Sequence, residues 1–184
     1  MPGVDLRRTL VVGHSEGGQV AATVASNNDF VTDVACLAAG AGTQLYDSLL
    51  AARIGNRPAF GATPAEQTAG LLAKWRDIQQ HATDPNRMWV GHSYPYWASF
   101  MPGAVVEELV RAKARAFVAL GSLETNAHAD IDLVNGTLLA WGRDITALVI
   151  EGANHGFQFP AEPKRDGWRE ILERVGEWFA PRAR

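Results

Sequence analysis

Four short runs of apolar, β-prone residues recur along the chain, and none of them alternates apolar with polar positions. The runs lie at residues 9–12, 32–38, 114–120 and 145–150. Such runs are typical of strands covered by helices on both faces of a parallel sheet. A glycine follows each run closely: Gly13, Gly40, Gly121 and Gly152. Since helical patterns separate the runs, the sequence predicts an α/β fold with a parallel sheet of about four strands.

Three segments carry the patterns of the flanking helices. Residues 16–26 are rich in glycine and alanine, which let a helix pack closely on a sheet. Before the fourth run, apolar residues recur at helical spacing at Ile131, Val134, Leu138 and Trp141. Near the C-terminus a longer stripe does the same, at Trp168, Ile171, Leu172, Val175, Trp178 and Phe179. We expect helices at all three places.

Residues 41–113 interrupt the alternation, because this segment holds no convincing buried strand and reads as largely helical. Thr63, Pro64 and Glu66 combine an N-cap, a proline at the first helical position and a capping-box glutamate. A second helix is expected over 104–112. Aromatic residues crowd between these two helices, at Trp89, Tyr94, Tyr96, Trp97 and Phe100. We interpret 41–113 as a helical cap insertion over a pocket, within one domain spanning 1–184. The alternative is a packed helical extension that binds no ligand.

Charge and composition narrow the possible partners. A net charge of −3 gives no basic field for nucleic acid or an anionic membrane. No apolar stretch approaches the roughly 20 residues that span a bilayer. Residues 1–8 lack the apolar core of a signal peptide, so the sequence as given favours the cytoplasm. Cys36 is the single cysteine and lies in an apolar run, which predicts a core residue. Metal-ligand spacings such as H-E-x-x-H do not occur, so no catalytic metal is expected.

The strongest chemical motif is Gly13-His14-Ser15-Glu16-Gly17-Gly18, a G-x-S-x-G between the first apolar run and a helix. A nucleophile on such a tight, strained turn leaves no room for side chains two residues to either side, and its hydroxyl projects at the carboxyl end of the strand. We therefore predict Ser15 as a nucleophile and the backbone N–H of Glu16 as an oxyanion donor. The ring of His14 should point away from the hydroxyl. The alternative is a glycine-rich turn without catalysis.

A serine hydroxyl needs a base, and the best candidate is His155, in a glycine-flanked loop directly after the fourth run. The histidines His81, His92 and His128 read as surface or cap residues. The acid that orients the base should follow the third run, which favours Glu124, with Asp130 and Asp132 as competitors in the following helix. A second Gly-His-Ser ends at Ser93, but it lacks the later glycine and Pro95 follows it. Ser93 is therefore not expected to be a nucleophile.

The order Ser15, Glu124, His155 on successive strand ends resembles the α/β-hydrolase superfamily, and the segment Asn154-His155-Gly156-Phe157 resembles the histidine loop of its esterase, dienelactone-hydrolase-like and prolyl-oligopeptidase-like members. The resemblance covers nearly the whole chain. It implies a cofactor-free serine hydrolase that acts on a small-molecule acyl substrate such as an ester, with a serine peptidase as an alternative.

In that superfamily the nucleophile lies near the middle of the chain, whereas here its motif begins at residue 13. The resemblance therefore implies a C-terminal half, in which strand 10–12 would be an open sheet edge able to pair with another chain. A second donor for the oxyanion is not identified. A catalytically silent hydrolase or interaction module is the alternative from a different functional class.

Overall fold

The computed structural model describes residues 7–180 and divides into two compact units. The first, the α/β unit, comprises the described residues up to Ala41 and from Ala104 onward. The second, the helical unit, spans Gly42–Gly103. Residues 1–8 were expected to lack a signal peptide, and residues 1–6 of that segment lie outside the described residues. No helix within 7–180 has both the length and the apolar character needed to cross a membrane.

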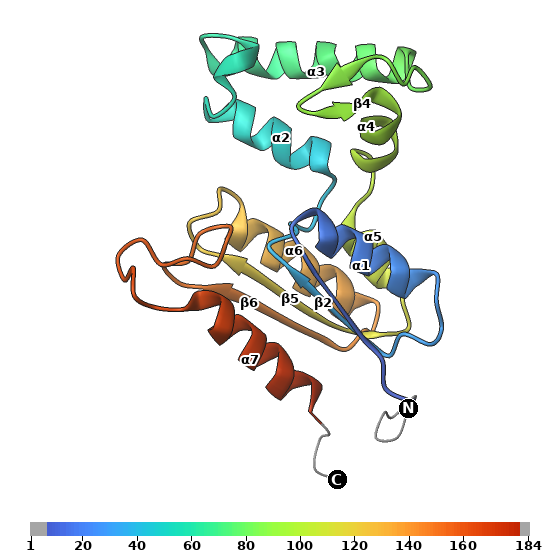
Figure 1. Ribbon diagram of the computed structural model, residues 1–184, viewed down its shortest axis with the longest axis vertical. Coiled ribbons are helices and arrows are strands. Elements are labelled where there is room, and N and C mark those ends of the chain that lie inside the picture. Colours follow the sequence, from blue (N-terminus) through green and yellow to red (C-terminus); the bar gives the residue numbers. More distant parts are fainter. Residues whose placement is uncertain (1–6, 181–184) are drawn as a thin grey trace. The chain divides into compact units, whose positions relative to one another are not determined.

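The α/β unit is built on a parallel four-stranded sheet, as the sequence predicts (Figure 1). Its strands are β1 (Leu10–His14), β2 (Asp33–Leu37), β5 (Arg115–Gly121) and β6 (Ile145–Ile150), in the spatial order β1-β2-β5-β6. The register pairs Val12 with Ala35, Ala35 with Phe117, and Phe117 with Thr146. Because all four strands run in one direction, their carboxyl ends meet at a single edge of the sheet.

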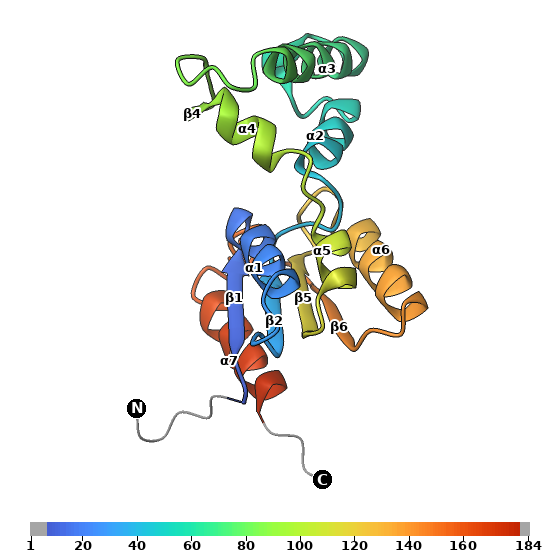
Figure 2. The same cartoon turned by 90° about the vertical axis from the view of Figure 1, so that its right-hand side faces the viewer.

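Helices cover both faces of this sheet (Figure 2). On one face lie α1 (Glu16–Ser26), α5 (Val105–Arg111) and α6 (Ala127–Ala140), and on the other lies α7 (Gly167–Phe179). The first face buries Cys36 completely, which raises the pKa of its thiol to about 12 and keeps it protonated. Its Sγ donates to the carbonyl of Gly18 at 3.3 Å, so Cys36 is the core residue that the sequence predicts.

Some apolar positions are less buried than the sequence patterns predict. Trp141 follows the last turn of α6 as its C-cap residue and is 67% exposed, and Leu172 of α7 is 51% exposed. The strands β1 and β6 are only partly buried, because each has a sheet neighbour on one side only among the described residues. The interior strands β2 and β5 carry the full burial expected of a strand covered on both faces.

The helical unit contains α2 (Gln44–Arg53), the 3₁₀ turn η1 (Pro58–Phe60), α3 (Pro64–Gln80) and α4 (Tyr94–Phe100). A two-residue hairpin, β3 (Met88–Trp89) with β4 (His92–Ser93), precedes α4. The predicted start of α3 is confirmed: Thr63 accepts from the N–H of Glu66, whose side chain accepts from the N–H of Thr63. Trp89 and Trp97 pack with ring centroids 4.7 Å apart.

The helical unit is shorter than the insertion expected at 41–113. Helix α5 belongs to the α/β unit, because Val105, Val106 and Leu109 are buried and the helix packs against α1 and α6. The helix expected over 104–112 is therefore buried in the main core rather than in the insertion.

Candidate active site

Ser15 occupies a sharp turn between β1 and α1. Its backbone has φ 55° and ψ −125°, a conformation that costs an L-residue on the order of 1–3 kcal/mol and persists where the surroundings impose it. Its N–H donates to the carbonyl of Leu37 at 2.8 Å, and its carbonyl accepts from the N–H of Gly18 at 2.9 Å. The turn is therefore tied both to the end of β2 and to the first turn of α1.

The glycines of the motif have different structural roles. A Cβ on Gly13 would lie 1.8 Å from the carbonyl oxygen of Gly17, so no side chain fits there. A Cβ on Gly18 would lie 2.5 Å from the Cβ of Ala39. Gly17 has open space around it, so the prediction that no side chain fits at this position is wrong. The close approach of α1 to the sheet is made at Gly18 instead.

His155 lies in the loop between β6 and α7, and its ring reaches the turn that carries Ser15. The distance from His155 Nε2 to Ser15 Oγ is 2.9 Å. The loop is shaped by Asn154, whose side-chain oxygen accepts from the N–H groups of Gly156 and Gln158 at 3.0 and 2.9 Å. Ser15 and His155 follow two parallel strands that are far apart in the sequence. They thus meet at one edge of the sheet.

Glu124 follows β5 and completes a linear array with these two residues. Its Oε2 lies 2.7 Å from His155 Nδ1, and its Oε1 accepts from the N–H of Gly121 at 3.0 Å. Since a carboxylate only accepts, Nδ1 of His155 carries the proton, and Nε2 is left to accept from the hydroxyl of Ser15. The hydrogen bond to Glu124 raises the pKa of His155 above its usual value, although partial burial acts in the opposite direction.

The two competing acids, Asp130 and Asp132, lie on helix α6. Asp130 is buried and accepts a hydrogen bond from the backbone N–H of Ala41, and burial raises the pKa of its carboxyl to about 6. Asp132 is exposed on the same helix. Of the three acids, Glu124 is the one that the fold brings to His155.

The other residues singled out in the sequence make different contacts. The ring of His14 points to the loop of His155, with Nε2 2.8 Å from the backbone oxygen of that residue. His128 is exposed on α6. His81, His92 and Ser93 belong to the helical unit, where His81 contacts Asp77, His92 stacks on Tyr96, and Ser93 precedes α4.

Glu16 is the first residue of α1, and Ser15 occupies the N-cap position. The first four N–H groups of a helix have no partner within it, so the backbone N–H of Glu16 can donate to an external acceptor beside the serine. Within residues 7–180 no three His, Cys, Asp or Glu side chains gather as they would around a metal ion.

Two glycines outside the G-x-S-x-G motif allow the histidine loop to approach its neighbours closely. A Cβ on Gly121 would lie 2.4 Å from the carbonyl oxygen of Ala153, and one on Gly167 would lie 1.7 Å from that of Phe157. The sequence marks Gly121 as the glycine that follows the third apolar run, but not its contact with the histidine loop. Gly167 carries no sequence signal of its own, because its need arises from a contact with a residue ten positions earlier.

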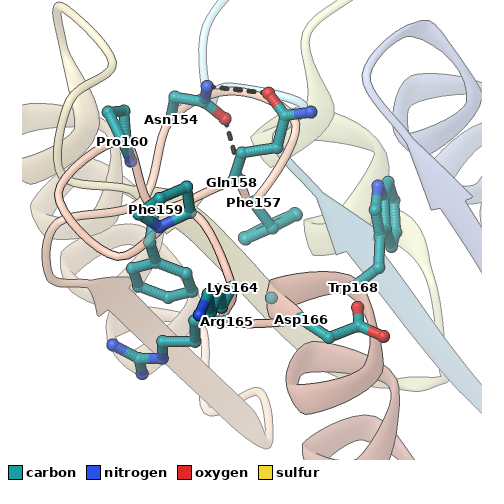
Figure 3. A pocket seen from close by; sticks show the side chains of 11 residues that line it. Asn154, Phe157, Gln158, Phe159, Pro160, Lys164, Arg165, Asp166 and Trp168 are labelled. Carbon is teal, nitrogen blue, oxygen red and sulfur yellow. Dashed lines mark hydrogen bonds between the residues drawn. The ribbon is translucent and has the colours of Figure 1, made fainter.

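A cavity of about 600 Å³ lies beside this loop (Figure 3). Its lining includes the apolar side chains of Phe157, Phe159 and Trp168. It also includes the charged side chains of Lys164 and Asp166. The figure shows the hydrogen-bonded pair Asn154 and Gln158 at the rim. Neither Ser15 nor His155 lines the cavity, so it adjoins the site rather than containing it.

The fold and the Ser-His-Glu array together place this chain among proteins of the α/β-hydrolase fold. Solved structures that it resembles include NosK from Streptomyces actuosus, with 19% identity, a TM-score of 0.51 and coverage of 91% of this chain and 67% of that one. An esterase from Pyrobaculum calidifontis gives 19% identity, a TM-score of 0.57 and coverage of 96% and 53%. An acylaminoacyl peptidase from Pyrococcus horikoshii gives 13% identity, a TM-score of 0.58 and coverage of 97% and 24%.

The chain thus matches these proteins over nearly all of its own length but spans from about a quarter to two thirds of theirs. The likeness establishes a partial α/β-hydrolase fold. No protein-family model matches the sequence, and no curated protein matches it by sequence.

Proposed function

We propose that the chain is a serine hydrolase that cleaves a carboxylic ester or a related acyl bond. The observation that carries the proposal is the continuous array from Ser15 Oγ to His155 Nε2, at 2.9 Å, and from His155 Nδ1 to Glu124 Oε2, at 2.7 Å. These distances lie within the range in which a base takes a proton from a nucleophile and is oriented by a third group.

In the proposed reaction Ser15 Oγ attacks the acyl carbon as His155 Nε2 takes the hydroxyl proton. The negative charge that develops on the carbonyl oxygen is stabilised by the backbone N–H of Glu16 at the start of α1. Collapse of the tetrahedral intermediate expels the alcohol, which receives the proton from His155. Water, deprotonated by the same histidine, then attacks the acyl-enzyme and releases the carboxylic acid and free Ser15.

Glu124 would hold His155 in the tautomer that can accept at Nε2 and would stabilise the imidazolium formed in each step. The bond from Gly121 N–H to Oε1 fixes the carboxylate, so that Oε2 faces the imidazole. Asp130 serves as a contrast, because its burial raises the pKa of its carboxyl to about 6 and it bonds to backbone instead of to a histidine.

The test is covalent labelling of the purified chain with a fluorophosphonate, read by intact mass. Attack by Ser15 Oγ on phosphorus expels fluoride and leaves a stable adduct, so one label per chain is expected. Ser15→Ala and His155→Ala should abolish it. Ser93→Ala is the matched control, since Ser93 ends the other Gly-His-Ser of the sequence and should not affect labelling.

Absence of labelling in a folded, monodisperse parent chain would reject the proposal for this chain and support a catalytically silent module instead. If labelling occurs, turnover of short acyl esters and of peptide substrates separates an esterase from a peptidase. Both kinds of enzyme occur among the structural neighbours, an esterase and an acylaminoacyl peptidase.

A further inference from the structure

The imidazole of His14 makes a hydrogen bond that the proposed reaction does not use. His14 is the last residue of β1 and immediately precedes Ser15. Its Nε2 lies 2.8 Å from the backbone carbonyl oxygen of His155. Because a carbonyl oxygen only accepts, Nε2 of His14 carries a proton and donates it. His14 and His155 therefore have opposite tautomers when neutral, Nε2–H and Nδ1–H respectively.

Three other rings surround the imidazole of His14. The ring of Trp168, from the first turn of α7, meets it edge to face at a centroid distance of 4.9 Å. The rings of His155 and Phe157 lie at 5.2 and 6.2 Å. These contacts restrict the orientation of His14, so its donor is directed at the histidine loop instead of turning freely in solvent.

His155 itself needs such support, because its side chain is 55% exposed and packing alone does not immobilise it. Other hydrogen bonds that fix the loop are made by the neighbours of His155: Ala153 accepts from the N–H of Leu123, outside the loop, and Asn154 exchanges bonds with Gln158. The bond from His14 acts on the main chain of His155 directly.

We propose that His14 is a positioning residue, whose ring holds the backbone of His155 so that the imidazole of His155 stays within reach of Ser15. This inference rests on the proposed hydrolase function. Two consecutive residues of the turn would then hold His155 by two hydrogen bonds. His14 bonds to its backbone carbonyl and Ser15 bonds to its ring. Holding His155 in place matters because a displacement of about 1 Å between reacting groups can slow catalysis about 10²-fold.

The experiment compares His14→Phe, which keeps an aromatic ring but removes the donor, with His14→Gln, whose amide N–H can reach the same carbonyl. The measurements are the rate of fluorophosphonate labelling of Ser15, the melting temperature, and the ¹H–¹⁵N NMR signals of the histidine rings. His128→Phe is the matched control, because His128 is exposed on α6. If His14→Phe fails to fold, His14→Asn replaces it, since the shorter amide cannot reach the carbonyl.

We expect His14→Phe to label about 10- to 100-fold more slowly than the parent at a similar melting temperature, and His14→Gln to regain most of that loss. The Nδ1–H signal of His155 should broaden in the Phe variant and sharpen again in the Gln variant. His128→Phe should match the parent in rate.

Equal labelling rates in the parent and His14→Phe would overturn the positioning role while leaving the hydrolase proposal intact. Equal losses in the Phe and Gln variants, with falls in melting temperature to match, would also overturn it and indicate a purely structural residue. A folded parent that does not label would instead reject the hydrolase function on which the inference rests.

Discussion

At the scale of one residue, the fold imposes on Ser15 a backbone conformation that is unfavourable for an L-residue. Its positive φ of 55° is maintained by hydrogen bonds at both its N–H and its carbonyl, to Leu37 and from Gly18. Close contacts flank the turn, because a Cβ on Gly13 would overlap the carbonyl of Gly17 and one on Gly18 would overlap Ala39. The strained serine thus lies between two glycines that are sterically required.

This arrangement predicts different effects for alanine at two glycines of the same motif. Gly13→Ala should lower the free energy of unfolding by about 2 kcal/mol or more and abolish labelling of Ser15, because its Cβ would overlap the backbone of Gly17. Gly17→Ala should leave stability unchanged or raise it by up to about 1 kcal/mol, since open space surrounds the site in α1. Urea denaturation and labelling measure both effects. Equal destabilisation by the two variants would contradict the geometry.

The pairing of His155 with Glu124 predicts how labelling depends on pH. His155 can accept the Ser15 proton only when it is neutral, and its hydrogen bond to Glu124 raises its pKa. Labelling should therefore fall as the pH drops through a midpoint above the usual histidine value of about 6.5.

Glu124→Gln removes the negative charge, so the midpoint should move to lower pH. The rate on the alkaline plateau should fall by roughly 10²-fold or more, because the imidazolium loses its charged partner. The measurement is the labelling rate from acid to mildly alkaline pH. An unchanged midpoint in the variant would show that Glu124 does not control the protonation of His155.

At the scale of elements, the contact between the histidine loop and helix α7 is the one that no local pattern reveals. The first residue of α7, Gly167, lies so close to the carbonyl of Phe157 that a Cβ would come within 1.7 Å of it. Trp168, the next residue, packs against both Phe157 and His14. Helix α7 therefore supports the site as well as covering one face of the sheet.

Gly167→Ala should displace the loop, lower the free energy of unfolding by about 1–3 kcal/mol and slow the labelling of Ser15. Gly176→Ala, in the same helix but with no atom near the added Cβ, is the control and should stabilise the protein by about 0.5–1 kcal/mol. Thermal melting and the labelling rate report the two effects. A Gly167→Ala chain that melts and labels like the parent would mean that the loop tolerates the shift.

At the scale of the molecule, β1 is an edge strand of the sheet within the described residues. Its central residue Val12 is 43% exposed. An apolar edge strand offers unpaired backbone groups to another strand. We propose that the chain self-associates through residues 10–12 of this strand.

The weight-average mass in sedimentation should then rise with protein concentration. Val12→Lys should reduce this rise, because a charged lysine on an edge strand opposes pairing. Leu139→Lys is the matched control, since Leu139 is 64% exposed on α6, away from the strand, and should leave association unchanged. A parent chain that stays monomeric at all concentrations would reject the proposal.

Much of the architecture could be predicted from the sequence because its signals are local. Apolar runs without alternation indicated the four strands within two residues of their observed bounds, and the capping box marked the start of α3 correctly. The assignment of the helix at 104–112 to the insertion was wrong, because local sequence indicates that a helix forms and does not show which core buries it.

Sequence by itself determined the fold class, the turn at Ser15 and the candidate status of His155 and Glu124, since chain order and residue type suffice for these. Only the tertiary structure decided which acid meets the histidine, which glycines are sterically required, and that His14 bonds to the backbone of His155. The physical reason is that these facts depend on distances between residues 31 and 141 positions apart, or between the backbones of different elements. Such distances are set by the register of the sheet and by the packing of helices against it.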